Sequence, residues 1–288
     1  MDIRALFLGL AFALMWSSAF TSARIIVAEA PPILSLALRF AISGALGVAL
    51  AFAMGQTARL TRAQWSAVIV FGVCQNALYL GLNFVAMQWI EASLAAIIAS
   101  VMPLLVAVCI WVLFGERTRA LGVAGLLAGT LGVALIMGTR LQGGADMLGV
   151  VFCLFGVVAL TAATLAMRGV SGGGNLMMVV GLQMLVGSAV LAPIGFALET
   201  WDVTWSPRLI TALAYTTLVP GLAATWVWFT LVDRIGATPA ATFHFLNPFF
   251  GVVVAALLLG ERLGLADAIG VVVIAGGILA VQVSRMRA

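Results

Sequence analysis

The chain has 288 residues, of which 64% are hydrophobic and only 8% are charged. Soluble domains have about 45–50% apolar and about 25% charged residues, and disordered chains have fewer apolar ones, so both classes are excluded. The net charge of +4 comes from arginines scattered singly between apolar runs, which argues against a nucleic-acid-binding surface. The composition indicates a protein that lies mostly within a lipid bilayer.

Ten apolar stretches are long enough to cross a membrane, because a spanning helix needs about 20 mostly apolar residues. Short segments separate them, so consecutive helices are expected to be antiparallel neighbours. The runs are too long for the alternating strands of a β-barrel. The sequence therefore predicts an all-α polytopic membrane protein with ten transmembrane helices, which in chain order cover residues 5–27, 33–54, 65–87, 93–114, 120–138, 147–168, 176–198, 208–232, 238–259 and 264–284.

The distribution of arginine predicts how the chain enters the membrane, because cytoplasmic loops carry more Arg and Lys than loops on the other side. The first apolar stretch runs to about Val27, which suits a retained helix better than a cleaved signal peptide. With the N-terminus inside, nine arginines flank the helices on the cytoplasmic side and four on the other side, while Arg39 lies within the second helix. Both termini are therefore expected in the cytoplasm.

The sequence repeats itself at a shift of 145 residues. Residues 90–117 and 235–262 are identical at ten of 28 positions, including Pro103 with Pro248 and the Gly-Glu-Arg sequence that ends both segments. This divides the chain into a first half, residues 1–144, and a second half, residues 145–288, with five predicted helices each. Because five is an odd number, the halves are expected to have opposite orientations in the membrane. Inverted repeats around a midplane site are typical of secondary transporters.

The doubled pattern of an apolar helix with a central proline, a Gly-Glu-Arg turn and a Gly-rich helix resembles the EamA-type drug/metabolite transporter superfamily. Residues 16–20, Trp-Ser-Ser-Ala-Phe, are similar to its first helix. The resemblance implies ten helices around a central cavity and export of amino acids or other metabolites from bacteria. The chain is also similar to the aromatic amino-acid exporters of that superfamily, the YddG type. Residues 155–158, Phe-Gly-Val-Val, depart from the first-helix pattern in the second half.

Polar and aromatic side chains inside the predicted helices are candidates for a substrate-binding cavity, because polar groups in the hydrocarbon region are costly. Asn76, Tyr79 and Asn83, for example, are spaced for one face of the third helix. Aromatic groups would stack on an aromatic or large apolar substrate. The alternatives are hydroxyls bonded to their own helix, amides that join two helices, and aromatic rings that only pack. The candidate substrate-binding residues are Trp16, Ser17, Thr21, Asn76, Tyr79, Asn83, Ser100, Thr161, Thr164, Trp228, His244 and Asn247.

Two prolines are expected to bend the fourth and ninth predicted helices. Pro103 cannot donate to the carbonyl of Ala99, and Pro248 cannot donate to the carbonyl of His244. Each carbonyl would then be free near the middle of the membrane to meet a substrate ammonium, a water or a hydroxyl. The alternative is a bend that only shapes the helix bundle.

Charged groups bear on how transport would be driven. No Asp or Glu lies near the middle of a predicted helix, whereas proton-driven carriers often use such a residue as a relay. Facilitated diffusion is therefore favoured over proton antiport, and the single histidine, His244, keeps the second option open. Arg39 is either a structural cation on backbone carbonyls or the partner of a substrate carboxylate, and its side chain is expected to reach towards the membrane surface.

These observations favour a secondary transporter that exports amino acids, aromatic or bulky apolar ones, by alternating access around a midplane cavity. The nearest alternative is a proton-coupled antiporter of other small metabolites. A membrane-embedded lipid-modifying enzyme is the alternative of another class, but the chain has no HExxH sequence and no pair of mid-helix carboxylates. No enzymatic activity, cofactor or metal is therefore expected.

The expected partners are a small-molecule substrate and membrane lipid, without nucleic acid, and the expected location is the bacterial inner membrane. Gly125 and Gly129 form a GxxxG sequence in the fifth helix, and Gly276 and Gly277 lie in the tenth. Small residues let helices approach closely. We expect these glycines to pack the fifth and tenth helices together within one chain, which favours a monomer over a homodimer.

Overall fold

The computed structural model of the protein describes residues 3–115, 119–142, 144, 146–166, 174–235, 240 and 242–286. Helices make up nearly all of these residues, and no strand occurs among them. The first half contains α1 (Ile3–Val27), α2 (Pro32–Ala53), α3 (Arg62–Phe71) continued by η1 (Gly72–Leu80) and α4 (Gly81–Ala86), α5 (Ala92–Ala99) followed by α6 (Met102–Phe114), and α7 (Ala120–Gln142).

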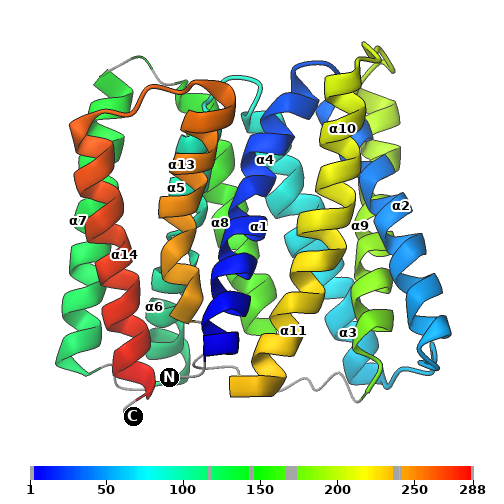
Figure 1. Cartoon of the computed structure of the whole chain (residues 1–288), viewed down its shortest axis with the longest axis horizontal. Coiled ribbons are helices and arrows are strands. Elements are labelled where there is room, and N and C mark those ends of the chain that lie inside the picture. Colours follow the sequence, from blue (N-terminus) through cyan, green and yellow to red (C-terminus); the bar gives the residue numbers. More distant parts are fainter. Residues whose placement is uncertain are drawn as a thin grey trace. The chain divides into compact units, whose positions relative to one another are not determined.

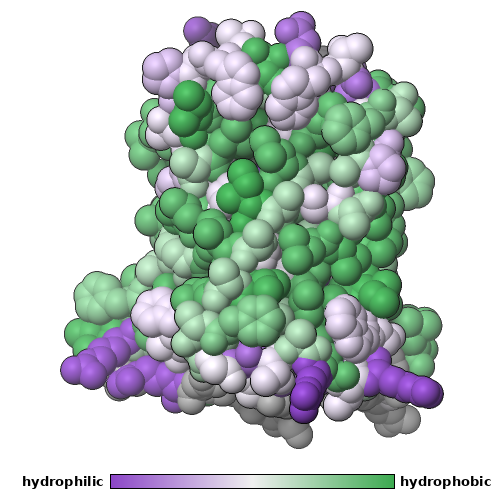
Figure 2. Space-filling view, turned by 90° about the vertical axis from the view of Figure 1, so that its right-hand side faces the viewer, coloured by the Kyte–Doolittle hydropathy of each residue, from purple (hydrophilic) through white to green (hydrophobic). Residues whose placement is uncertain are grey.

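The second half repeats this order of elements. It contains α8 (Met147–Ala166), α9 (Leu176–Leu198), α10 (Pro207–Thr216) continued by η2 (Thr217–Ala223) and α11 (Ala224–Ile235), η3 (Thr242–Leu246) followed by α13 (Asn247–Leu259), and α14 (Leu265–Met286). Eight described stretches are long and apolar enough to cross a membrane, and two further apolar helices, Phe243–Leu259 and Leu265–Val281, are shorter. These ten stretches match the ten predicted helices. Figure 2 shows a broad apolar band on one face of the molecule, with hydrophilic side chains at its two ends.

Several helix ends follow directly from local sequence. The Thr61 hydroxyl accepts the N–H of Gln64, and the Gln64 side chain accepts the N–H of Thr61, which is a capping box at the start of α3. Gly115 ends α6 and Gly260 ends α13, both in the left-handed conformation, with φ of 68° and 69°. Glycine adopts this conformation without the steric cost of a Cβ atom. The glycine of each Gly-Glu-Arg sequence is therefore a helix stop.

By packing, the chain divides into two compact units. Unit 1 comprises Met1–Thr21, Trp89–Val150 and Ala223–Ala288, and unit 2 comprises Ser22–Gln88 and Val151–Leu222. Neither unit coincides with one half of the sequence, because each takes segments from both halves. The four boundaries between them fall inside α1, between α4 and α5, inside α8 and at the end of η2.

Within unit 1, α7 and α14 lie side by side through their glycines (Figure 1). A Cβ atom on Gly125 would lie 2.6 Å from the carbonyl oxygen of Gly277, and one on Gly132 would lie 3.0 Å from that of Gly270. The later glycine of α7, Gly132, meets the earlier glycine of α14, Gly270, so the two helices are antiparallel. The predicted packing of the fifth helix on the tenth is confirmed.

Within unit 2, α2 and α9 form the corresponding pair (Figure 1). A Cβ atom on Gly195 would lie 3.2 Å from the backbone nitrogen of Leu34, whereas one on Gly181 would lie 3.0 Å from the carbonyl oxygen of Gly44. These helices are therefore antiparallel too. The two helices of each pair hold the same position in the two halves, so the halves are inverted repeats, as predicted.

Both units contain paired irregularities of their helices. The π-helix η1 starts at Gly72 and the π-helix η2 starts at Thr217, which is 145 positions later. The fourth span is interrupted between α5 and α6, just before Pro103, and the ninth changes from η3 to α13 just before Pro248. Irregular turns of this kind expose backbone groups and are frequent at functional sites. These irregular turns are therefore candidate positions for a substrate-binding site.

Candidate functional site

A cluster of aromatic rings from α1, α11 and η3 lies in unit 1. The ring centroid of Phe12 is 4.8 Å from that of Trp228 and 5.1 Å from that of His244. Trp228 and His244 are 5.2 Å apart, and Trp16 lies 5.8 Å from Phe12. Phe12 is buried, whereas the other three side chains are half-buried. We call these four residues the aromatic cluster; its partly exposed rings can stack on an aromatic or apolar ligand.

A polar network borders the aromatic cluster. The Asn247 side-chain nitrogen Nδ2 lies 3.0 Å from His244 Nδ1, and the Ser17 hydroxyl donates to the Asn247 carbonyl oxygen at 3.1 Å. With Asn247 Nδ2 as the donor, His244 Nδ1 accepts and the ring proton lies on Nε2. The network therefore joins α1 to the junction of η3 and α13.

Two polar atoms of this region are buried without a hydrogen-bond partner among the described residues, namely Asn247 Oδ1 and Thr21 Oγ1. A buried acceptor that makes no hydrogen bond costs about 1–3 kcal/mol. Such groups are rare in folded proteins and call for an explanation such as a ligand or a water molecule. Asn247 Oδ1 is thus suited to accept an N–H group from a ligand.

The helix interruptions of unit 1 determine where these groups lie. α5 ends at Ala99, and the hydroxyl of the buried Ser100 donates to the carbonyl of Ile97 at 2.6 Å. His244 lies in the 3₁₀ turn η3, and Asn247 begins α13, with Pro248 in its first turn. The side chains of His244 and Asn247 therefore lie where the 3₁₀ helix changes to an α-helix.

The candidate polar residues of unit 2 are buried except for the half-buried Thr164, and they do not form one cluster. Asn76 Nδ2 donates to the Gln183 carbonyl in α9 at 2.9 Å. Asn83 Nδ2 donates to the Tyr79 carbonyl at 2.8 Å, and its Oδ1 accepts from Cys153 Sγ, in α8, at 3.3 Å. Asn76 and Tyr79 lie within η1, whose wider turn changes the helical register before Asn83 in α4, so Asn76 contacts α9 whereas Asn83 contacts α8. A role of these residues in binding stays a prediction.

The hydroxyls of α8 bond to their own helix. Thr161 donates to the carbonyl of Val157 and Thr164 donates to that of Leu160, each at 2.8 Å. This is the usual arrangement for a threonine within a membrane helix. A role of these two residues in binding stays a prediction.

Arg39 is buried inside the helix bundle and bonded to a backbone carbonyl, which matches the structural alternative for this cation. Its side chain is 5% exposed, and Nε donates to the carbonyl oxygen of Thr216 at 3.3 Å. The residue four positions after Thr216 is Pro220, which has no backbone N–H to donate to the Thr216 carbonyl oxygen. The backbone carbonyl therefore gives the guanidinium a partner inside the bundle that the sequence did not reveal.

Sequence reasoning missed Phe12 as a member of the site. Phe12 precedes Trp16 by four residues and so lies on the same face of α1. That spacing was sufficient to find it. Of the two π-helices, η2 contains Pro220, a signal that sequence reasoning did not use, whereas η1 contains no proline.

Two inverted five-helix repeats, with buried polar and aromatic groups at interrupted helices, define a membrane transporter. Residues 3–138 and residues 147–282 each match the EamA-like transporter family, and the chain belongs to this family. The double match agrees with the repeat seen in the sequence. Because the family is one of transporters, the lipid-modifying enzyme has no support.

The relatives of this chain cover between about half of it and its whole length. The uncharacterized transporter YvbV of Bacillus subtilis is 29% identical over 271 residues, which cover 93% of this chain and 88% of YvbV. The aromatic amino acid exporter YddG of Ancylobacter novellus is 33% identical over 139 residues, which cover 48% of each chain. A solved crystal structure with 24% sequence identity and a TM-score of 0.69 covers 100% of this chain and 99% of its own, and shows the same fold.

Proposed function

We propose that this transporter exports amino acids, aromatic or bulky apolar ones, across the inner membrane of bacteria. The observation that carries the proposal is the aromatic cluster beside the unpartnered Asn247 Oδ1. The partly exposed rings of Trp16 and Trp228 would stack on the substrate side chain. Asn247 Oδ1 would accept a hydrogen bond from the substrate ammonium. The similarity to the aromatic amino acid exporter YddG, which covers 48% of each chain, supports this substrate class.

The proposed mechanism is alternating access. Residues 1–144 and 145–288 would act as two inverted halves that open a midplane site to one side of the membrane at a time. The interruptions before Pro103 and Pro248, together with η1 and η2, provide symmetry-related places where helices can bend. We expect a monomer to be sufficient, because each inverted pair of helices packs within a single chain.

The transport is proposed to be facilitated diffusion down the substrate gradient. Three of the described carboxylates, those of Glu199, Glu261 and Asp267, accept backbone N–H groups at or next to the starts of helices. They are therefore engaged at helix ends rather than placed as mid-membrane proton relays. A proton-coupled antiporter of other small metabolites is the second candidate, and the half-buried His244 is the observation that favours it.

The test is flux of labelled phenylalanine and tryptophan in liposomes that contain the full-length protein, with and without an imposed pH gradient. Saturable flux that ignores the gradient is the expected result. Accumulation driven by the gradient would reverse the assignment of coupling and make His244 the relay candidate. Flux no greater than in empty liposomes, from protein shown to be folded, would contradict the amino-acid substrate and leave the family assignment intact.

A further inference from the structure

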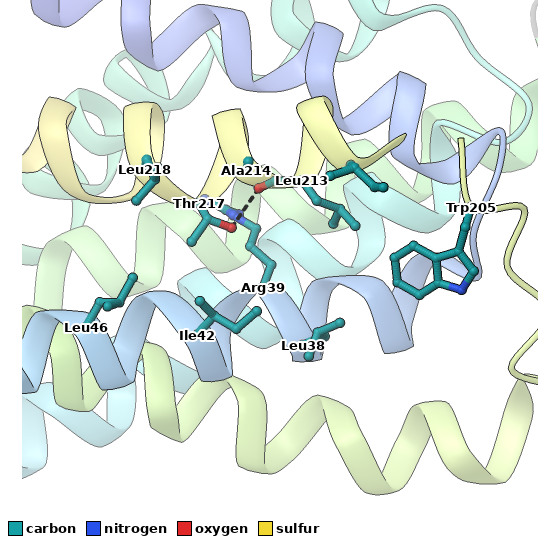
Figure 3. A pocket seen from close by; sticks show the side chains of 10 residues that line it. Leu38, Arg39, Ile42, Leu46, Trp205, Leu213, Ala214, Thr217 and Leu218 are labelled. Atoms are coloured by element: carbon teal, nitrogen blue, oxygen red, sulfur yellow. Dashed lines mark hydrogen bonds between the residues drawn. The ribbon is translucent and has the colours of Figure 1, made fainter. Parts of the chain in front are cut away.

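Unit 2 contains a pocket of about 330 Å³ between α2 and the α10–η2 segment. Its walls are almost entirely apolar and include Leu38, Ile42 and Leu46 from α2 and Leu213 and Leu218 from the opposite side (Figure 3). Leu38, Ile42 and Leu218 are exposed. The pocket therefore opens on an apolar surface of the kind that a bilayer covers, and differs from the aromatic cluster of unit 1.

Arg39 lines this apolar pocket and is buried. Its Nε donates to the Thr216 carbonyl oxygen at 3.3 Å, and its Cζ lies 4.9 Å from the ring centroid of Phe40. No carboxylate of the described residues pairs with it. A guanidinium carries five N–H donors, so most of its donor capacity is unused. A buried charge without a counterion is costly, so an anion that reached the guanidinium from the pocket would be stabilised there.

We infer that the pocket binds a single-chain amphipathic carboxylate, of the fatty-acid type, taken from the surrounding bilayer. The carboxylate would pair with the two terminal nitrogens of Arg39, since planar guanidinium and carboxylate groups form bidentate hydrogen bonds. The acyl chain would lie along Ile42 towards Leu46 and Leu218, which follow one another away from Trp205 in Figure 3. Trp205 lies at the opposite end of the pocket, in the segment before α10.

Size and charge distinguish this ligand from other membrane anions. A volume of about 330 Å³ is at the lower end of small-molecule pockets, which suits one chain better than a two-chain phospholipid. An amino acid would also need a partner for its ammonium, and none of the lining residues is acidic. The Thr217 hydroxyl is already engaged, because it donates to the Leu213 carbonyl at 2.7 Å. The site thus favours an apolar monoanion over a zwitterion.

The test is equilibrium binding of radiolabelled dodecanoate to the purified full-length protein in detergent, with dodecanol and an anionic phospholipid as competitors. Arg39→Gln removes the charge and keeps a hydrogen-bond donor for Thr216. Arg208→Gln is the matched control, because Arg208 is exposed at the start of α10 and does not line the pocket. Leu218→Trp fills the pocket from an exposed position and leaves Arg39 intact.

We expect saturable dodecanoate binding that weakens about tenfold or more in Arg39→Gln, as expected for a charge-assisted hydrogen bond. Leu218→Trp should also lose binding, Arg208→Gln should bind as the unmodified protein does, and dodecanol should compete poorly. Equal competition by dodecanol, preferred binding of the phospholipid, or unchanged binding in Leu218→Trp would each overturn the inference. Competition by dodecanol, competition by the phospholipid and the Leu218→Trp variant test the inference even if Arg39→Gln fails to fold. The assay requires no transport, so its outcome is independent of the proposed function.

Discussion

The backbone N–H groups of Ile33 and Met178, which are 145 positions apart, are capped in the same way by side chains from the opposite half of the chain. Ile33 donates to Glu199 Oε1 at 2.9 Å, and Met178 donates to Gln56 Oε1 at 3.0 Å. Glu199 also accepts from Leu34 at 2.8 Å, because a carboxylate offers two acceptor oxygens where an amide offers one. The repeat therefore preserves the capping geometry while the residue that provides it differs.

This capping predicts unequal effects of two substitutions. Glu199→Ala removes two hydrogen bonds to the N-terminus of α2 and should lower the free energy of unfolding by about 1–2 kcal/mol. Gln56→Ala removes one bond at α9 and should cost less. Thermal unfolding of the purified protein in detergent measures both. Glu199→Gln is the control, and equal midpoints for Glu199→Ala and the unmodified protein would contradict the prediction.

Alanine substitutions of two adjacent glycines of α14 should have different effects on the stability of the protein. A Cβ atom on Gly277 would lie 2.6 Å from the Gly125 carbonyl oxygen, whereas one on Gly276 would meet nothing within 4 Å. Gly277→Ala should therefore destabilise the protein by about 1–3 kcal/mol through overpacking. Gly276→Ala should be neutral or slightly stabilising, because alanine favours helix. The same thermal measurement separates them, and similar midpoints for the two variants would refute the close approach of α7 and α14.

The aromatic cluster predicts that Trp228 matters for substrate affinity and that Trp226 does not. Trp228 contacts Phe12 and His244, whereas Trp226 is 57% exposed. Trp228→Leu should raise KM for phenylalanine flux about two- to tenfold, which corresponds to the loss of one aromatic contact. Trp226→Leu should leave KM unchanged. Liposome flux at several substrate concentrations gives both values, and equal KM values for the two variants would argue against the aromatic cluster as the site.

Asn247 predicts a distinction between two ligands. Asn247→Leu removes the unpartnered acceptor, so phenylalanine should bind about tenfold more weakly through loss of a hydrogen bond to its ammonium. 3-Phenylpropionate has no ammonium, and its inhibition constant should not change. Competition against labelled tryptophan flux measures both constants. A parallel loss for both ligands would mean that Asn247 acts only by shaping the helix junction.

The arginine distribution predicts the orientation of the chain. Ala58 lies between α2 and α3 on the predicted cytoplasmic side, and Asp202 lies between α9 and α10 on the other side; both are exposed. In a background with all three native cysteines replaced by alanine, Asp202→Cys should react with a membrane-impermeant maleimide in intact cells. Ala58→Cys should react only after permeabilisation. The reverse pattern would place both termini outside the cytoplasm.

The positions of the membrane spans were predictable from the sequence, because apolar length alone sets them. The inversion was also predictable from the odd number of helices in each half. Pro103 and Pro248 marked the places where the structure interrupts a span, since proline removes a backbone donor wherever it stands.

Other features depend on contacts that local sequence does not contain. Arg39 finds its partner in Thr216, 177 positions away, so its direction could not be read from α2 alone. The π-helix η1 moves Asn76 and Asn83 to different neighbours without altering the apolar pattern. Five residues of the candidate site come together in unit 1, namely Trp16, Ser17, Trp228, His244 and Asn247. They could be found from the sequence because they share helical faces or lie near the prolines.

The interleaving of the halves in the two compact units has a consequence for the order of folding during synthesis. Unit 2 ends at Leu222, whereas unit 1 needs the last segment of the chain, Ala223–Ala288. The ribosome therefore delivers every residue of unit 2 before α14 exists to pack on α7. Since regions completed early can fold first during synthesis, α7 must wait in the membrane for its partner while α2 and α9 are already able to associate.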